Sequence, residues 1–321
     1  FMIASIYKSP KGFLGGKNKL KNAIKPVIKN SLKKSKDNIS YHYDIGNDFY
    51  KLWLDESMTY SCGYFENEDD TLEQAQMNKV DYILKKLNLK EGNTLLDIGC
   101  GWGELILAAA KKYKVHALGI TLSQEQLEKV NKRIKKEGLE NLVDVCLLDY
   151  RQIKNRTFDR IVSVGMLEHV GKDNLEEYFS VVHSLLNDGG ISLLHCITSQ
   201  KGGTNEWIDR YIFPGGYIPS IPELVNNITD KSFHLIDAES LRRHYARTLE
   251  HWAKNFEDSI SEIRKTKDET FIRMWRLYLN SCAASFHVGN IDIHQFIFSK
   301  GLADDIPWTR KYLYEDNKIN S

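Results

Sequence analysis

The chain of 321 residues is long enough for one large domain or two small ones. Its composition, 42% hydrophobic and 27% charged, excludes a disordered chain, a fibrous repeat and a disulfide-stapled mini-protein. It has no apolar run long enough to cross a bilayer and no signal-peptide pattern. The five cysteines are odd in number and widely spaced, without a CxxC pair, so we expect a cytoplasmic protein and no metal site.

The charge is distributed unevenly along the chain. Residues 1–40 contain ten lysines and one aspartate, whereas the whole chain has a net charge of +1, so the remainder carries about −8. We predict a basic N-terminal arm over residues 1–40. Its apolar residues between Lys17 and Lys36 follow helical spacing, which Pro26 interrupts. The arm is either a solvated leader or a segment that binds an anionic partner, a membrane surface or nucleic acid.

Residues 41–65 hold eight aromatic residues in 25 positions, against 11% in the whole chain. One interpretation is a helix that packs on the core. The other is an aromatic lid over a pocket, and both can hold in part.

From residue 71 onward, helical and strand patterns alternate. Thr71 and Gln74 form a capping-box pattern that begins a helix ending near Leu87, and Ser123 and Gln126 form another that begins a helix ending near Glu137. Two more helices are predicted at about 103–113 and 173–187. Strands are predicted at 94–98, 115–119, 143–148, 160–164 and 191–197. This alternation is typical of a parallel sheet covered by helices.

The pattern changes after residue 197. Residues 199–233 are rich in glycine, proline and aromatic residues and predict a long excursion over the sheet, which is usually functional at that length. Two helices follow at about 239–265 and 268–286, and a last strand at 292–298.

The segment Leu95-Leu-Asp-Ile-Gly-Cys-Gly-Trp-Gly103 is the sharpest local signal. It predicts a strand, a glycine loop and the start of a helix, an arrangement that brings backbone close to a ligand. Asp97 precedes the first glycine, where it would repel a pyrophosphate but can pair with an amino-acid ammonium group. Asp149, at the end of the third strand, is placed to accept a hydrogen bond from an adenine amino group. Both features favour S-adenosylmethionine over a dinucleotide.

The second strand lacks the acidic residue that usually binds the ribose hydroxyls. Gln126 offers a substitute in the first turn of the next helix, and it also serves as the capping-box partner of Ser123.

Taken together, the motifs resemble those of bacterial cyclopropane fatty acid synthases and the related mycolic acid cyclopropane synthases. The resemblance runs collinearly from about residue 40 to 300. It is carried by His42-Tyr-Asp-Ile-Gly-Asn-Asp-Phe49, Tyr60-Ser-Cys-Gly-Tyr-Phe65, the glycine loop, Gly119-Ile-Thr-Leu-Ser123, Val164-Gly-Met-Leu-Glu-His-Val-Gly171, Leu194-His-Cys-Ile197, Tyr211-Ile-Phe-Pro-Gly215 and Tyr278-Leu-Asn-Ser-Cys-Ala283. Glu104 and Cys196 depart from the family pattern. The smaller N-terminal domain of the enterobacterial-type enzymes is expected to be absent or reduced to the basic arm.

The resemblance implies a Rossmann-like class I S-adenosylmethionine-dependent methyltransferase with a mostly parallel seven-stranded sheet and helices on both faces. We expect a catalytic domain over 41–321, with an aromatic lid at 41–65 and a lipid-pocket insertion at 198–290. It further implies that the enzyme acts on the cis double bond of an unsaturated phospholipid acyl chain. The arm is then expected to bind the anionic inner membrane surface rather than nucleic acid, so we expect a peripheral membrane protein. A homodimer is possible under this resemblance and is not decided by the sequence.

The resemblance also assigns site residues. Besides Asp97, which the glycine loop itself indicates, the expected cofactor contacts are Tyr60, Ser61, Gly99, Cys100, Gly101, Thr121, Leu122, Ser123, Gln124, Glu125, Gln126, Tyr150 and Arg151. The expected bicarbonate site comprises Cys62, Glu168, His195, the Ile197 backbone and Tyr245. Cys282 matches a proposed active-site cysteine of the family, although it also fits a small buried apolar residue.

The expected chemistry needs a base, exclusion of water and stabilisation of a carbocation, because ring closure removes a proton from the newly added methyl group. Aromatic faces near 41–65 and at Tyr211, Phe213 and Tyr217 are candidates for the stabilisation. Three alternatives stay open: lipid methylation without ring closure, amine N-methylation, and a non-catalytic lipid- or nucleic-acid-binding protein.

Overall fold

The computed structural model describes residues 45–314, and the fold is described for that part of the chain. Seven strands form one sheet in the order β3-β2-β1-β4-β5-β7-β6. The strands are β1 (Thr94–Ile98), β2 (His116–Thr121), β3 (Val143–Leu147), β4 (Phe158–Val164), β5 (Leu186–Ser199), β6 (Phe233–Ser240) and β7 (Ile291–Lys300). The first five strands run parallel, and β7 is antiparallel to both its neighbours, β5 and β6. The prediction of a mostly parallel seven-stranded sheet is confirmed.

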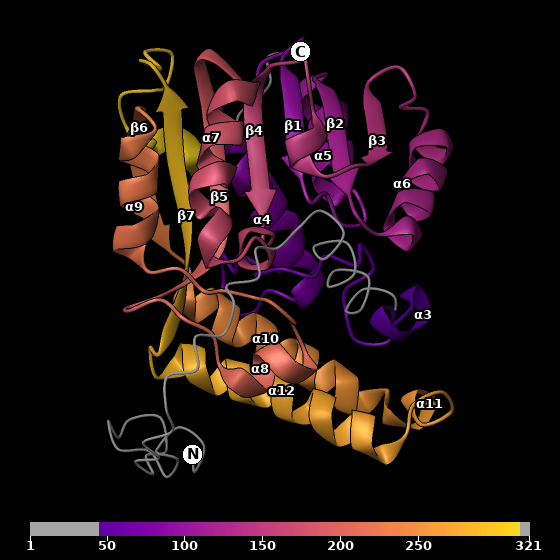
Figure 1. Ribbon diagram of the computed structural model, residues 1–321. Coiled ribbons are helices and arrows are strands. Elements are labelled where there is room, and N and C mark those ends of the chain that lie inside the picture. Colours follow the sequence, from indigo (N-terminus) through magenta and orange to yellow (C-terminus); the bar gives the residue numbers. More distant parts are fainter. Residues whose placement is uncertain (1–44, 315–321) are drawn as a thin grey trace.

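Helices cover both faces of this sheet and its carboxyl edge (Figure 1). The helices are α3 (Asn47–Tyr50), α4 (Leu72–Lys86), α5 (Glu104–Tyr113), α6 (Gln124–Glu137), α7 (Leu175–Leu185), α8 (Glu206–Tyr211), α9 (Ile221–Asp230), α10 (Arg242–Asp258), α11 (Ile260–Ile263) and α12 (Glu269–His287). Four short 3-10 turns join them: η1 (Tyr150–Gln152), η2 (Leu167–His169), η3 (Lys172–Asn174) and η4 (Arg310–Leu313).

The two faces of the sheet form separate cores because successive residues of a strand point to opposite sides. Leu95 of β1 packs in a core with α4, α5 and α6. Its neighbour Leu96 packs on the other side, in a core with α7 and α9. Both leucines are fully buried.

A third core lies between the sheet and the layer of α8, α10 and α12, which Figure 1 shows at the edge toward which β4 points. Phe49, Tyr50 and Trp53 are buried there with Trp252 of α10 and Trp275 of α12. This part of the aromatic stretch 41–65 therefore packs as core, which is the first of the two interpretations of that stretch. His42, Tyr43 and Asp44 lie outside the described residues, as does the predicted arm.

The structure departs from the predicted elements mainly after residue 199. The expected excursion contains α8 and α9. Residues 233–240 form β6, whereas the sequence predicts an excursion up to 233 and a helix from about 239, with no element between them. Among the described strands, β6 pairs with β7 alone and is largely exposed, so its sequence lacks the apolar alternation of a covered strand. The expected insertion at 198–290 thus includes one strand of the sheet. The helix predicted to end near 265 ends at Asp258 and is followed by α11.

One of the two predicted capping boxes is complete. Thr71 accepts a hydrogen bond from the backbone N–H of Gln74, and the Gln74 side chain accepts one from the N–H of Thr71. Ser123 accepts from the N–H of Gln126, but the Gln126 side chain turns to Thr121 instead. The prediction of a second full box is wrong, because the Ser123 N–H is satisfied by the Thr121 hydroxyl. Among the described helices, none is long and apolar enough to span a membrane.

Candidate active site

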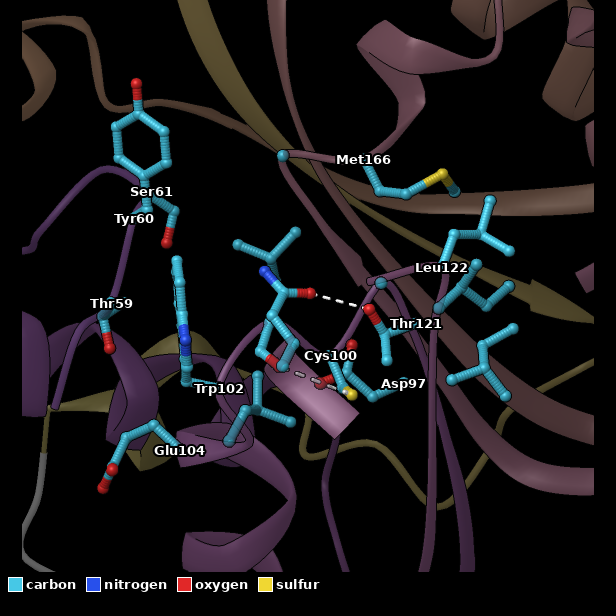
Figure 2. A pocket seen from close by; sticks show the side chains of 18 of the residues that line it. Thr59, Tyr60, Ser61, Asp97, Cys100, Trp102, Glu104, Thr121, Leu122 and Met166 are labelled. Atoms are coloured by element: carbon cyan, nitrogen blue, oxygen red, sulfur yellow. Dashed lines mark hydrogen bonds between the residues drawn. The ribbon is translucent and has the colours of Figure 1, made fainter. Parts of the chain in front are cut away.

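The loop between β1 and α5 forms the floor of a cavity of about 140 Å³ at the carboxyl edge of the sheet (Figure 2). Gly99 and Gly101 have φ angles of +87° and +54°, a region that favours glycine. A Cβ on Gly99 would lie 2.8 Å from Cγ of Met166, whereas a Cβ on Gly101 would have no atom within 4 Å. The loop thus packs closely at Gly99 and leaves room for a ligand at Gly101.

Most of the predicted cofactor contacts line this cavity. They are Tyr60, Ser61, Asp97, Gly99, Cys100, Gly101, Thr121, Leu122, Gln126, Tyr150 and Arg151. The remaining three do not: Ser123 is buried as the N-cap of α6, and Gln124 and Glu125 are exposed. Glu125 instead accepts a hydrogen bond from the Asn47 amide at 2.7 Å.

Asp97 and Lys79 are two of the buried ionisable side chains that line the cavity. Asp97 is buried, and its Oδ1 has no hydrogen-bond partner among the described residues. Burial raises the pKa of Asp97 to about 7, although the charge of Lys79 on α4 opposes this shift. Lys79 donates to the Ser61 hydroxyl at 2.9 Å, and burial lowers its pKa to about 8. A carboxylate oxygen out of solvent without a partner fits the ammonium group of an amino-acid ligand.

Gln126 is held by its neighbour. The Thr121 hydroxyl donates to Gln126 Oε1 at 2.7 Å (Figure 2, dashed line from Thr121). Since the amide oxygen is bound in this way, we expect the amide nitrogen to face a ribose hydroxyl.

Asp149 is engaged more fully than the sequence predicts. The Arg151 guanidinium donates to both carboxylate oxygens at 2.8 Å, and the Arg151 backbone N–H donates to Oδ1 at 3.0 Å. Asp149 also lines the cofactor cavity, and a carboxylate has about four acceptor positions, so the contact with an adenine amino group stays a prediction.

A second, larger cavity of about 590 Å³ adjoins the first. Tyr60, Ser61, Gly165 and His169 line both cavities, so the two meet at these residues. Most of the remaining lining is apolar or aromatic and comes from η2, β5, α8, α10 and α12. Phe213 and Tyr217 line it as expected, whereas Tyr211 does not.

Four of the five predicted bicarbonate residues line this larger cavity: Glu168, His195, Ile197 and Tyr245. Glu168 Oε1 accepts the Ile197 backbone N–H at 2.7 Å, whereas its Oε2 has no partner among the described residues. His195 is fully buried, and its Nε2 likewise has none within that part of the chain. Burial raises the pKa of Glu168 to about 7 and lowers that of His195 well below its usual value.

The two cysteines are placed differently. Cys62 is fully buried, lines neither cavity, and its thiol contacts the Gly63 carbonyl oxygen at 3.2 Å. Cys282 lines the larger cavity, and burial raises the pKa of its thiol to about 12. The Cys282 thiol is therefore protonated near neutral pH, which argues against a nucleophilic role.

Several further residues line the cofactor cavity without having been predicted from the sequence, among them Lys79, Met166 and His169. Burial lowers the pKa of His169 to about 4, so its ring is neutral. A signal for Lys79 was present: it falls on the apolar face of α4, three and four residues from the buried Gln76 and Ile83.

The sheet order, the glycine loop at the end of β1 and the adjoining cofactor cavity define a class I S-adenosylmethionine-dependent methyltransferase. A family model described as "Mycolic acid cyclopropane synthetase" matches residues 30–296. The chain belongs to this family of cyclopropane fatty acid and mycolic acid synthases.

Individual relatives agree with this assignment. The chain is 45% identical to a "Probable fatty acid methyltransferase" from Pseudomonas putida, over 86% of this chain and 73% of the relative. It is 42% identical to the "Cyclopropane-fatty-acyl-phospholipid synthase" of Escherichia coli K12, over 83% and 68%. Among solved structures, the Mycobacterium tuberculosis cyclopropane synthase MmaA2 matches with a TM-score of 0.79 and 38% identity, over 83% of this chain and 98% of that one. Mycolic acid cyclopropane synthase CmaA1 in complex with SAH and CTAB gives the same TM-score at 36% identity, over the same shares of the two chains.

Proposed function

We propose that this enzyme is a cyclopropane-fatty-acyl-phospholipid synthase that adds a methylene group across the cis double bond of an unsaturated acyl chain, with bicarbonate as the base. One observation carries the proposal. Two buried polar atoms without partners among the described residues, Glu168 Oε2 and His195 Nε2, belong to side chains that line a large, mainly apolar cavity next to the cofactor cavity.

S-adenosylmethionine supplies an electrophilic methyl group when it is bound. Asp97 is the residue that would hold its ammonium group, because Oδ1 lies out of solvent and lacks a partner in the described part of the chain. Gly101 leaves the backbone open to the ligand, and Gln126 would face the ribose. The residues of the smaller cavity thus fit this cofactor.

The larger cavity suits an acyl chain and a cationic intermediate on it. Tyr60, Phe213, Tyr245 and Tyr278 line it, and aromatic faces stabilise a cation without forming a bond to it. The Tyr60 and Tyr278 hydroxyls are hydrogen-bonded at 2.6 Å, which fixes the Tyr60 ring at the junction of the two cavities. A cavity of this volume accepts a substantial length of hydrocarbon, and an acyl chain that fills it would exclude water.

Bicarbonate, when bound, supplies a base that removes a proton from the added methyl group. Glu168 Oε2 would accept the hydroxyl hydrogen of the anion, while the Ile197 backbone N–H holds Oε1 of the same carboxylate in place. His195 Nε2 would face one of the oxygens of the anion. Tyr245 lines the same cavity, whereas Cys62 is buried in the third core and lines neither cavity. The residues fit a small oxyanion.

A second candidate is methylation of a lipid double bond without ring closure, which the name of the Pseudomonas putida relative favours. Expression in bacteria that make unsaturated phospholipids but lack this activity separates the outcomes. We expect mass spectrometry to show a gain of one CH₂ per unsaturated chain and proton NMR to show ring protons in place of olefinic ones. Lipids that do not change, or that gain a methyl branch, would contradict the proposal. Cells that express the Glu168→Gln enzyme are the control.

The place of action is also a proposal. We infer from the charge of residues 1–40 that the enzyme works from the cytoplasmic side, with its basic arm on an anionic membrane surface. The arm lies outside the described residues, so the charge alone supports this step.

A further inference from the structure

Behind His195 lies a row of buried polar side chains that the proposed reaction does not use. The register of the sheet places His195 on β5 opposite Gln295 on β7, and Gln295 opposite Glu239 on β6. Lys86 at the end of α4 packs against this row and forms an ion pair with Glu239. The side chains of His195, Gln295 and Lys86 are almost completely buried.

The hydrogen bonds along this row have a fixed direction. Lys86 Nζ lies 2.8 Å from Gln295 Oε1, and Gln295 Nε2 lies 3.0 Å from His195 Nδ1. An ammonium group only donates, so it requires the amide oxygen of Gln295 to face it. The amide NH₂ then faces the histidine and donates to it. His195 Nδ1 must therefore accept, and a neutral ring carries its proton on Nε2.

Glu239 is the counter-ion of Lys86. Burial lowers the pKa of Lys86, and Glu239 opposes this shift through its charge and its hydrogen bond. The Tyr82 hydroxyl donates to both carboxylate oxygens of Glu239, at 3.0 and 3.2 Å. Burial and the nearby charges of Lys79 and Lys86 disfavour a second proton on His195.

We propose that Lys86 and Gln295 are positioning residues that fix His195 as a neutral ring with its proton on Nε2, so that it permanently donates into the larger cavity. There the Nε2–H would donate to an oxygen of a bound oxyanion. The identification of that anion as bicarbonate rests on the proposed function. Glu168 Oε2 is the matching acceptor in the same cavity. The site thereby recognises a species with both an acceptor oxygen and a hydroxyl, which bicarbonate has.

The test is ¹⁵N NMR of the histidine rings in the full-length protein. Wild-type His195, assigned by its loss in a His195→Gln protein, should give the shifts of a neutral ring protonated on Nε2. In Gln295→Glu the new carboxylate accepts from Nδ1, so the ring should change to the other tautomer. The other nine histidines of the chain serve as internal references. A wild-type ring protonated on Nδ1, or on both nitrogens, would overturn the proposal without any variant.

Activity provides a second readout. We expect Gln295→Glu to raise the bicarbonate concentration needed for half-maximal turnover at least tenfold, with the affinity for S-adenosylmethionine unchanged. Gln295→Leu removes the hydrogen bond without reversing it. We expect mixed tautomers of His195 and a smaller rise in the bicarbonate concentration needed for half-maximal turnover. This variant serves as the test if the Gln295→Glu protein does not fold. An unchanged tautomer in both variants contradicts the proposal. If the expected tautomers appear but no cyclopropane product forms, only the proposed function fails.

Discussion

At the scale of single residues, the cofactor cavity contains a buried carboxyl group, Asp97, whose ionised form is unfavourable. Asp97 is buried and has an oxygen without a partner among the described residues, and Lys79 is the charge that opposes the rise in its pKa. The folded pKa of about 7 lies above the ordinary value of 3.8. A raised pKa means that folding favours the protonated acid, so Asp97 costs stability as the pH rises from below 4 through 7. A bound ammonium group would relieve this cost.

We therefore predict that Asp97→Asn stabilises the cofactor-free protein while weakening cofactor binding. The gain in unfolding free energy should be larger at pH 8 than at pH 5, by about 2 kcal/mol, because the carboxylate is fully ionised only at the higher pH. Binding of S-adenosylmethionine should weaken by about 10- to 100-fold. Denaturant unfolding at both pH values and calorimetry measure the two effects. Equal changes in stability at pH 5 and pH 8 would contradict the assigned pKa.

A substitution at Glu168 should impair proton removal without impairing cofactor binding. Glu168→Gln keeps the shape and one acceptor but removes the charge, so turnover should fall by two to three powers of ten, within the range of about 10²–10⁴-fold typical of general-base catalysis. Affinity for S-adenosylmethionine should stay nearly unchanged. Removal of dissolved bicarbonate should mimic this loss in the wild-type enzyme, and its return should restore turnover. Full activity without bicarbonate would exclude it as the base.

At the scale of elements, the loop from β1 to α5 was predicted well because its signals are local. Consecutive residues encode the strand, the glycines with positive φ and the start of the helix. The capping box at Thr71 is equally local. The Gln126 side chain was misassigned because its partner, Thr121, lies on the preceding strand and competes with the backbone of Ser123. Edge strand β6 was missed because its exposed residues give no alternation.

The glycine loop gives a prediction with a matched control. Gly101→Val should weaken binding of S-adenosylmethionine about tenfold or more, because its side chain would enter the cavity. Gly138 at the end of α6 also has a positive φ, +65°, and a Cβ there would have no atom within 4 Å, but it does not line the cavity. Gly138→Val should therefore cost similar stability and leave the affinity unchanged. Equal affinities of the two variants by calorimetry would remove the loop from the cofactor site.

At the scale of the whole molecule, the larger cavity exists because the helical layer packs over the carboxyl edge of the sheet (Figure 1). Three of the residues assigned to the bicarbonate site, Glu168, His195 and Tyr245, come from η2, β5 and α10, which are far apart in the sequence. Spacing alone could not bring Glu168, His195 and Tyr245 together, and only the family resemblance did so. Cys62 shows the limit of that resemblance, since it is buried in the third core instead of lining the cavity.

The positioning row was partly visible in the sequence. Lys86 lies on the apolar face of a predicted helix, and Gln295 lies within the last predicted strand. A buried polar residue in an apolar pattern indicates a partner elsewhere in the fold. The partner itself, His195, follows only from the register between β5 and β7.

The basic arm should matter for membrane binding more than for chemistry. Each lysine near an anionic surface contributes about 1 kcal/mol, and salt screens this contribution. Deletion of residues 1–36, which contain all ten lysines of the arm, should reduce sedimentation with anionic vesicles at low salt. Turnover on detergent-dispersed lipid should change little. An arm with every lysine changed to arginine is the control and should bind as the wild type does; equal binding of the deleted protein would make the arm a simple leader.

The most direct test of ring formation follows the hydrogens of the transferred carbon. With trideuteromethyl S-adenosylmethionine and unsaturated phospholipid, ring closure must remove one deuteron from the added group. We predict a product with two deuterium atoms on the new carbon and no remaining double bond at that position, by mass spectrometry and NMR. A product that keeps all three deuterium atoms in a methyl group would contradict ring closure and make the enzyme a simple methyltransferase.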